Sequence, residues 1–446
     1  MEVFTLHHMT KWILAAALVL CLLLGCTAAA ESYYLELPSK GISSSMKITM
    51  DIPEENDVAD GISPLTGEPW YGNYYPILVT IDNHPDAVPH WGVASADILY
   101  EMPVQSDGST RCAALFMTNV PSFVGPVRSG RVPWGSLREI WGGAWVFYGW
   151  QTWARTVNLV VDVVDWALEL HNDARVKGRW IFPFIEGTER NYSSLFHREH
   201  DGDHVAPHDV QVDMHAVESL FTEEPAMHPF KFTETGLDRG VDVSNITIEY
   251  KTTNPAYVTS FVYNDLTGKY ERYRNGESYY DALNGMITEY ANVIVLRTDV
   301  SWYNNAPQRP VIQLVGQGTC EIFQNGKYVR GTWVRTHDDK KADEFKSLPS
   351  RMIFFDENGE ELEMKVGMTA IQVVDNEQAV IVTAGEAIKG ATAQATPKPT
   401  ATPKPTRTPK PTRTPKPTRT PKASAYTPEP MIEVEEEGDE DFSFGG

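Results

Sequence analysis

The chain has 446 residues, a formal net charge of −22 and four cysteines. So few cysteines cannot form a disulfide framework, and an acidic chain without a basic stripe on its body argues against nucleic acid as a primary partner. The stretch from Gly61 to Gly385 has a globular composition and is too long for one ordinary core, so we expect two domains.

The N-terminal segment predicts export. Lys11 precedes an uninterrupted apolar run, Trp12 to Leu24, which is typical of a signal peptide and too short to span a bilayer comfortably. The run ends in Leu23-Leu24-Gly25-Cys26, which resembles a lipobox, where cleavage precedes a cysteine that then carries lipid. We therefore expect a signal peptide at residues 1–25 and a lipid on Cys26 that holds the protein at the extracytoplasmic face of the cell membrane.

The residues after Cys26 leave one alternative open. Ala28-Ala29-Ala30 also satisfies the rule for ordinary cleavage, which would release a secreted protein. Residues 26–60 are expected to form a flexible tether.

Residues 61–235 are expected to form an N-terminal mixed α/β domain. Apolar runs at Ile77–Ile81 and Ala144–Phe147 indicate buried strands. They alternate with helical patterns near Pro133–Ile140 and Asp209–Phe221, an order typical of mixed α/β or α+β folds.

Residues 241–385 are expected to form a mainly β C-terminal domain, which makes the whole chain α+β. Short alternating segments predict strands at Thr247–Tyr250, Val258–Tyr263, Val293–Leu296, Val311–Leu314 and Ile371–Val374. Asn-Gly pairs, a strong hairpin signal, occur between them at Asn275-Gly276, Asn284-Gly285, Asn325-Gly326 and Asn358-Gly359.

Residues 391–446 are expected to form a disordered tail. A Thr-Pro-Lys-Pro-Thr-Arg repeat from Thr396 to Lys422 favours extended polyproline II and cannot build a core. An acidic stretch, Glu433 to Asp441, follows the repeat. The segment from Thr396 onward holds eight basic and eight acidic residues, so the charge of −22 belongs to the rest of the chain.

Several motifs together resemble one family. These motifs are Pro64-Leu65-Thr66-Gly67, Asn83-His84-Pro85, Ala96-Asp97-Ile98-Leu99-Tyr100-Glu101, Gly125-Pro126-Val127-Arg128-Ser129, Ala206-Pro207-His208, Phe323-Gln324-Asn325-Gly326-Lys327 and Gly331-Thr332-Trp333. They resemble the YerB-like lipoprotein family over essentially all of Pro64 to Val374. The resemblance implies a two-part extracytoplasmic lipoprotein whose biochemical role is unknown.

The segment from Gly125 to Arg131 is the main candidate binding site. Its glycines and proline fix a turn before Pro133, which favours the start of a helix. Free N–H groups at a helix start and guanidiniums beside them suit a phosphate or a carboxylate. We predict a ligand site at Arg128, Ser129, Arg131, Arg111 and Asn83. The alternative is that the arginines form structural ion pairs with Asp82, Asp97 or Glu101.

These observations favour a binding or scaffold protein for an anionic wall or lipid-derived ligand, or for a protein partner. The alternative is a cell-envelope hydrolase that acts on wall polymer with Asp82, Glu101 and His208 as an acid–base set. No sequence motif fixes a reaction, and we expect no cofactor.

Two further features, a histidine-rich segment and a pair of cysteines, are assigned no functional role. The histidines His197, His200, His204 and His208 are interrupted by Gly202 and Pro207, so we predict no metal site from their spacing. Cys112 and Cys320 could form one bridge, but we favour two buried thiols.

Overall fold

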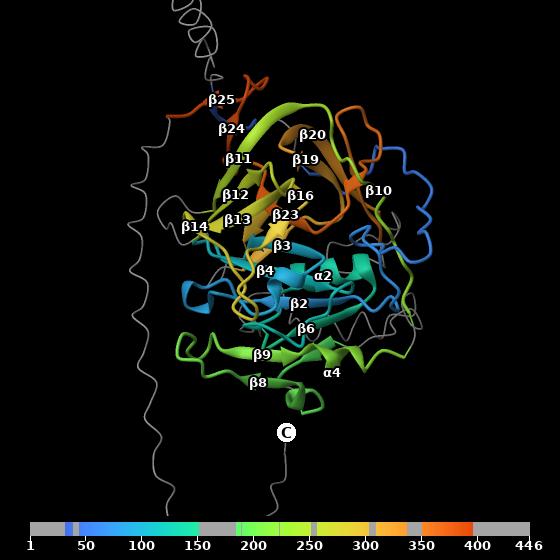
Figure 1. The fold of residues 1–446 in the computed structure, drawn as a ribbon, viewed down its shortest axis with the longest axis vertical. Coiled ribbons are helices and arrows are strands. Elements are labelled where there is room, and N and C mark those ends of the chain that lie inside the picture. Colours follow the sequence, from blue (N-terminus) through green and yellow to red (C-terminus); the bar gives the residue numbers. More distant parts are fainter. Residues whose placement is uncertain are drawn as a thin grey trace, which may run out of the picture. The chain divides into compact units, whose positions relative to one another are not determined.

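The computed structural model describes residues 32–38, 44–150, 184–188, 190–222, 224–250, 257–302, 309–336 and 350–395. The predicted signal peptide with Cys26 lies outside these residues, as do the Thr-Pro-Lys repeat and the acidic stretch. Both predicted halves of the body lie in one compact unit (Figure 1).

A long mixed sheet runs through both halves. Its order, from hydrogen-bonded pairs, is β7 (Phe184–Glu186), β6 (Ala144–Phe147), β2 (Ile77–Ile81), β4 (Thr110–Phe116), β3 (Ile98–Pro103), β23 (Thr369–Asp375), β16 (Asn292–Thr298), β19 (Gly316–Gln324), β20 (Lys327–Arg335) and β21 (Met352–Phe355). The pairs β7–β6, β6–β2, β3–β23 and β23–β16 are parallel. The strands β2, β4 and β16 are buried along their whole length, which explains their continuous apolar runs, because both faces of the sheet are covered.

Different elements cover the two faces of the N-terminal half. On one face, Trp134 and Leu137 of α2 (Val132–Trp141) pack with Leu78 of β2. On the other, Val79 packs with Val212 of a small sheet in the order β5-β9-β8. That sheet consists of β5 (Phe123–Val124), β9 (Val210–Asp213) and β8 (Phe196–Arg198).

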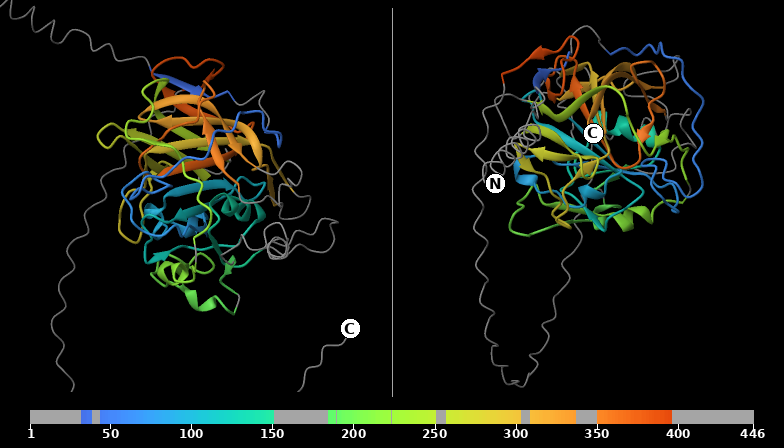
Figure 2. Two further views of the ribbon diagram at one scale, coloured as in Figure 1. Left: turned by 90° about the vertical axis from the view of Figure 1, so that its right-hand side faces the viewer. Right: turned by 45° about the horizontal axis from the view of Figure 1, so that its top comes forward.

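A second array of strands packs on the C-terminal half. It consists of β25 (Thr392–Ala393), β1 (Tyr33–Glu36), β24 (Val380–Ala384), β11 (Val241–Glu249), β12 (Val258–Asn264), β13 (Lys269–Arg274), β14 (Glu277–Ser278) and β15 (Glu289–Tyr290). Ile246 and Phe261 of this array share a core with Val293 of β16. Because β11 also pairs with β20, the described strands of both arrays form one 18-stranded sheet. Figure 2 shows the C-terminal strands, yellow to red, gathered beside the N-terminal ones.

The predicted Asn-Gly hairpins at two positions are confirmed. Asn275-Gly276 joins β13 to β14 and Asn325-Gly326 joins β19 to β20, with positive φ at all four residues. The remaining short elements are η1 (Pro85–Ala87), η2 (Val93–Ser95), η3 (Ser193–Leu195), α4 (Met214–Glu218), β10 (Phe232–Thr233), β17 (Val300–Trp302), β18 (Pro310–Ile312) and β22 (Met364–Lys365).

The two halves are joined by strand pairing and by buried ion pairs. β3 of the N-terminal half runs parallel to β23 of the C-terminal half, with Glu101 opposite Gln372. Arg272 of β13 lies 2.8 Å from Glu101, and both side chains are fully buried. A second buried pair, between Glu139 of α2 and Arg335 of β20, spans 3.2 Å.

Three sequence predictions need correction. The predicted helix near Asp209–Phe221 is a strand, β9, followed by the short α4, because Val210 and Val212 are buried against β5 and β8 and Asp213 caps the helix. Residues 33–36 of the predicted tether form β1, which pairs with β24. Residues 392–393 of the predicted tail form β25, which pairs with β1.

Within the residues that the structure describes, no helix combines the length and the apolar character needed to cross a membrane.

Candidate anion site

The loop from Gly125 to Arg131 is held by backbone hydrogen bonds to the end of β2 and to β9. The Asp82 amide donates to the Pro126 carbonyl (2.8 Å), and the Arg128 amide donates to the Thr80 carbonyl (2.9 Å). The Val127 amide donates to the carbonyl of Val210 on β9 (2.7 Å). The loop then enters α2, with Arg131 at its N-cap position and no side-chain cap. These contacts hold the predicted arginines at the end of β2.

Asp82 is the centre of the polar contacts at this end of β2. Its Oδ2 lies 3.0 Å from Arg128 Nε and accepts a hydrogen bond from His208 Nδ1 at 2.7 Å. Its Oδ1 accepts the backbone N–H of His84 at 3.1 Å. Burial raises the pKa of Asp82, but the hydrogen bond from His208 and the charges of Arg111 and Arg128 outweigh it and hold the pKa well below its usual range. Asp82 is therefore a fixed anion.

Arg111 and Arg131 are buried without a carboxylate partner among the described residues. Each is about 8% exposed, and each donates from Nη1 to one backbone carbonyl, that of Ser129 (2.8 Å) and that of Gly130 (2.7 Å). The Nε of each is buried and has no hydrogen-bond partner. Burying a cation in this way is costly unless a counter-charge is supplied.

A fourth arginine, Arg309, completes what we call the arginine cluster, namely Arg111, Arg128, Arg131 and Arg309. Burial, and after it the charges of the other three guanidiniums, hold the pKa of Arg131 well below its usual value. Burial lowers the pKa of Arg111 to about 10; the charge of Asp82 opposes this effect, and the charges of Arg128 and Arg309 add to it. Two carboxylates act on the cluster: Asp82 is ion-paired with Arg128, and the charge of Asp107 acts on Arg309.

The sequence predicted three of these four arginines. Arg309 was missed, because it lies just before β18 in the C-terminal half, and only the tertiary fold brings it near Arg111. Its Nη1 donates to Gln105 Oε1 at 2.7 Å. The alternative was that the arginines form structural ion pairs with carboxylates. This holds for Arg128, which pairs with Asp82, but not for Arg131.

Ser129 and Asn83, also predicted to bind the ligand, lie in different surroundings. Ser129 is half-buried, and its carbonyl accepts from Arg111. Asn83 is 1% exposed and turns inward, where its amide donates to Glu101 (3.0 Å) and to Thr110 (2.7 Å). Asn83 therefore belongs to the buried network between the two halves.

The candidate acid–base set is only partly brought together. His208 and Asp82 are in contact, whereas Glu101 is fully buried in its pair with Arg272. Two hydroxyl groups also donate to Glu101, that of Thr110 (2.8 Å) and that of Thr259 (3.0 Å).

The remaining histidines and the cysteines have separate surroundings. His204 contacts Asp201 (2.7 Å) and the Pro89 carbonyl (3.0 Å), and His197 contacts Gln211 (3.0 Å). Cys112 and Cys320 are free and buried, so the preference for two buried thiols is confirmed.

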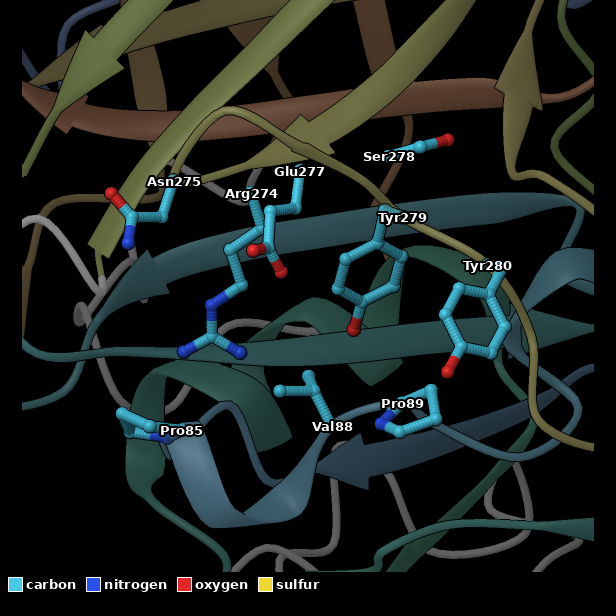
Figure 3. Close-up of a pocket in the computed structure, with 9 residues that line it drawn as sticks. All are labelled: Pro85, Val88, Pro89, Arg274, Asn275, Glu277, Ser278, Tyr279 and Tyr280. Atoms are coloured by element: carbon cyan, nitrogen blue, oxygen red, sulfur yellow. The ribbon is translucent and has the colours of Figure 1, made fainter. Parts of the chain in front are cut away.

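A pocket of about 350 Å³ opens beside this region, between the two halves (Figure 3). Pro85, Val88 and Pro89 of the loop after β2 form one wall, and Arg274 and Tyr279 of the C-terminal half face them. Arg274 donates to the Asn83 carbonyl at 2.6 Å, so the pocket borders the residues that follow Asp82.

The fold and this site define a largely β protein of two joined halves with a buried arginine cluster. The chain belongs to the YerB-like family. Residues 65–227 match the family model described as "Protein of unknown function (DUF3048) N-terminal domain", and residues 246–371 match the corresponding C-terminal domain.

A curated relative and a solved structure agree with this assignment. The chain is 23% identical over 329 residues to "Putative lipoprotein YerB" of Bacillus subtilis (strain 168), which covers 73% of this chain and 90% of the relative. The crystal structure of YerB from Bacillus subtilis superposes with a TM-score of 0.55 at 22% identity, covering 70% of this chain and 96% of that one. This second likeness shows a shared fold.

Proposed function

We propose that the protein is a membrane-anchored, extracytoplasmic binding module whose arginine cluster holds an anionic envelope ligand. The observation that carries the proposal is the burial of Arg111 and Arg131, each with an unpartnered Nε and no carboxylate partner among the described residues. The lipobox-like Leu23–Cys26 and the printed name of the Bacillus relative support the anchored location.

We expect the cluster to bind an anion because its positive charge exceeds the negative charge around it. Four guanidiniums face two carboxylates, Asp82 and Asp107, although the chain as a whole has a charge of −22. Arginine does not lose its proton in proteins, so the cost of its burial persists in the free protein. An anion that enters the cluster removes this cost, and it gains charge-assisted hydrogen bonds from donors that now lack partners.

The unpartnered donors point to a phosphate-type ligand. A guanidinium presents its N–H groups in a planar fork that matches two oxygens of a phosphate or a carboxylate. Excess charge from several arginines favours a ligand with more than one negative charge, such as a phosphate monoester or a diphosphate.

The hydrolase alternative receives less support from the same geometry. An acid–base set needs its members to line one open cleft, but Glu101 is fully buried against Arg272. Asp82 and His208 are in contact, but Asp82 is also ion-paired with Arg128, which leaves it less free to act as an acid or a base.

Calorimetric titration with inorganic phosphate and with pyrophosphate tests the proposal. Loss of one charge-assisted pair worth roughly 1.5–3 kcal/mol should weaken binding about 10- to 100-fold in Arg131→Met. Arg131→Lys keeps the charge but loses the fork, so we expect an intermediate loss. The matched control is Arg239→Met, because Arg239 is 44% exposed and pairs with Asp356 and Glu357. Equal binding by all four proteins would refute the proposal.

A further inference from the structure

Three side chains from two distant segments converge beside Asp82. His84 and Asp86 follow β2, and His208 precedes β9; one ligand atom of each lies within 4.8 Å of the other two. No local pattern indicates this grouping, because the neighbours of His208 in the chain are other histidines that the fold places elsewhere. We propose that His84, Asp86 and His208 bind a divalent transition-metal ion, with zinc as the best match.

The ring of His208 is held in the orientation that a metal ligand needs. An ionised carboxylate accepts hydrogen bonds only, so His208 Nδ1 carries the proton that it donates to Asp82 Oδ2 at 2.7 Å. In the neutral imidazole this hydrogen bond leaves the lone pair on Nε2, which is the nitrogen that a metal ion would bind. A carboxylate that fixes the tautomer and direction of a ligating histidine is a regular feature of zinc sites.

Asp82 is itself held in place, and it contacts the ring of His208 and the backbone of His84. Arg128 lies against its Oδ2 at 3.0 Å, and the backbone N–H of His84 donates to its Oδ1 at 3.1 Å. The rings of His84 and His208 are nearly parallel, with centroids 4.4 Å apart. One carboxylate thus connects the segment of His84 to the segment of His208.

The other two ligands, His84 and Asp86, already have a spacing that suits a metal ion. His84 Nδ1 and Asp86 Oδ2 are 3.5 Å apart, and two ligands of tetrahedral zinc, each about 2.0–2.1 Å from the ion, are separated by about 3.3 Å. Metal binding replaces a 3.2 Å hydrogen bond from the Asp86 amide to His84 Nδ1. Because the rings of His84 and His208 are stacked, metal binding also requires the His84 ring to turn, which its 45% exposure permits.

The ligand set indicates the kind of ion. Two imidazoles and one carboxylate suit zinc and related first-row ions better than magnesium or calcium, which prefer oxygen. Three protein ligands leave a fourth position for water or an anion. The ion would connect the loop after β2 to the segment before β9.

This inference does not depend on the arginine cluster. The metal is bound by His84, Asp86 and His208, whereas the anion proposal rests on Arg111 and Arg131. Titration of pyrophosphate into chelator-treated protein therefore tests the anion proposal alone, and titration of metal without pyrophosphate tests the metal proposal alone.

The experiment is a titration of the purified, chelator-treated full chain with Co²⁺, followed by competition with Zn²⁺. Tetrahedral Co²⁺ bound to nitrogen and oxygen gives visible absorption bands, and Zn²⁺ should abolish them at one equivalent. Asp86→Ala is the principal variant, because Asp86 is 61% exposed and its loss should not affect folding. His215→Ala is the matched control, since His215 is 60% exposed and lies outside the grouping.

We expect Asp86→Ala and His84→Ala to lose the Co²⁺ bands and to bind Zn²⁺ at least 10-fold more weakly, while His215→Ala binds as the wild type does. Asp82→Asn keeps all three ligands but loses the carboxylate that orients His208, so its affinity should fall about 10- to 100-fold. Absence of stoichiometric binding in the wild type, or equal binding by Asp86→Ala and the wild type, would overturn the proposal.

Discussion

Replacement of Glu101 by Gln should destabilise the protein severely, because Glu101 provides the counter-charge at the junction of the two halves. Its carboxylate lies 2.8 Å from Arg272, and both side chains are 0% exposed. The hydroxyls of Thr110 and Thr259 and the amide of Asn83 also donate to it. Gln keeps the volume of the side chain but leaves Arg272 charged and buried.

The size of this destabilisation follows from the burial of the Glu101–Arg272 pair. Removing one partner of a buried ion pair costs about 3–5 kcal/mol, because the remaining charge has no compensation. A native domain is stable by about 5–15 kcal/mol in total, so this one change removes a large part of the free energy of unfolding. The double variant Glu101→Gln/Arg272→Met removes both charges and should recover much of the loss.

Urea-induced unfolding, followed by tryptophan fluorescence, measures this difference. Glu363→Gln is the control, because the pair of Glu363 with Lys231 spans 2.8 Å but is about half exposed, and such pairs contribute less than about 1 kcal/mol. A loss in Glu101→Gln no larger than that in Glu363→Gln would refute the reasoning, and so would a double variant less stable than Glu101→Gln.

Three other outcomes are expected. Burial raises the pKa of Asp97 from 3.8 to about 6. The contribution of Asp97 to stability is therefore present below pH 4 and is lost as the pH rises through 6. Urea unfolding at each pH should show that the free energy of unfolding of the wild type falls by roughly 3 kcal/mol relative to Asp97→Asn between pH 4 and pH 7. Burial raises the pKa of the Cys112 thiol to about 12, so thiol reagents should modify it only in denaturant, and rapid labelling of the native protein would contradict this. A fragment of residues 241–385 leaves β23 without its partner β3; in calorimetry it should lack the cooperative thermal transition that we expect of the intact protein.

The local chemistry of the sequence predicted the turns and strands well. Asn-Gly favours positive φ at both positions, and Asn325-Gly326 adopts it between β19 and β20. Continuous apolar runs likewise identified β2 and β6. The segment at Val210 was predicted as a helix because its strand character depends on pairing with β5 and β8, which periodicity does not reveal.

The site was predictable only where its residues are neighbours in the sequence. Arg128 and Arg131 share one turn, so their motif was visible. Arg309 and Arg272 come from the C-terminal half, and no local pattern indicates that Arg309 approaches Arg111 or that Arg272 pairs with Glu101. The turn of Asn83 toward Glu101 likewise depends on a long-range contact.

Thermal unfolding of Arg131→Met, with and without pyrophosphate, tests the central claim most directly. Arg131 is buried, and no carboxylate among the described residues pairs with it. We therefore expect the free variant to melt at the wild-type temperature or above it. Pyrophosphate, which should raise the Tm of the wild type by binding the folded state, should raise that of the variant clearly less. A large loss of Tm in the free variant, together with an undiminished pyrophosphate shift, would contradict the account.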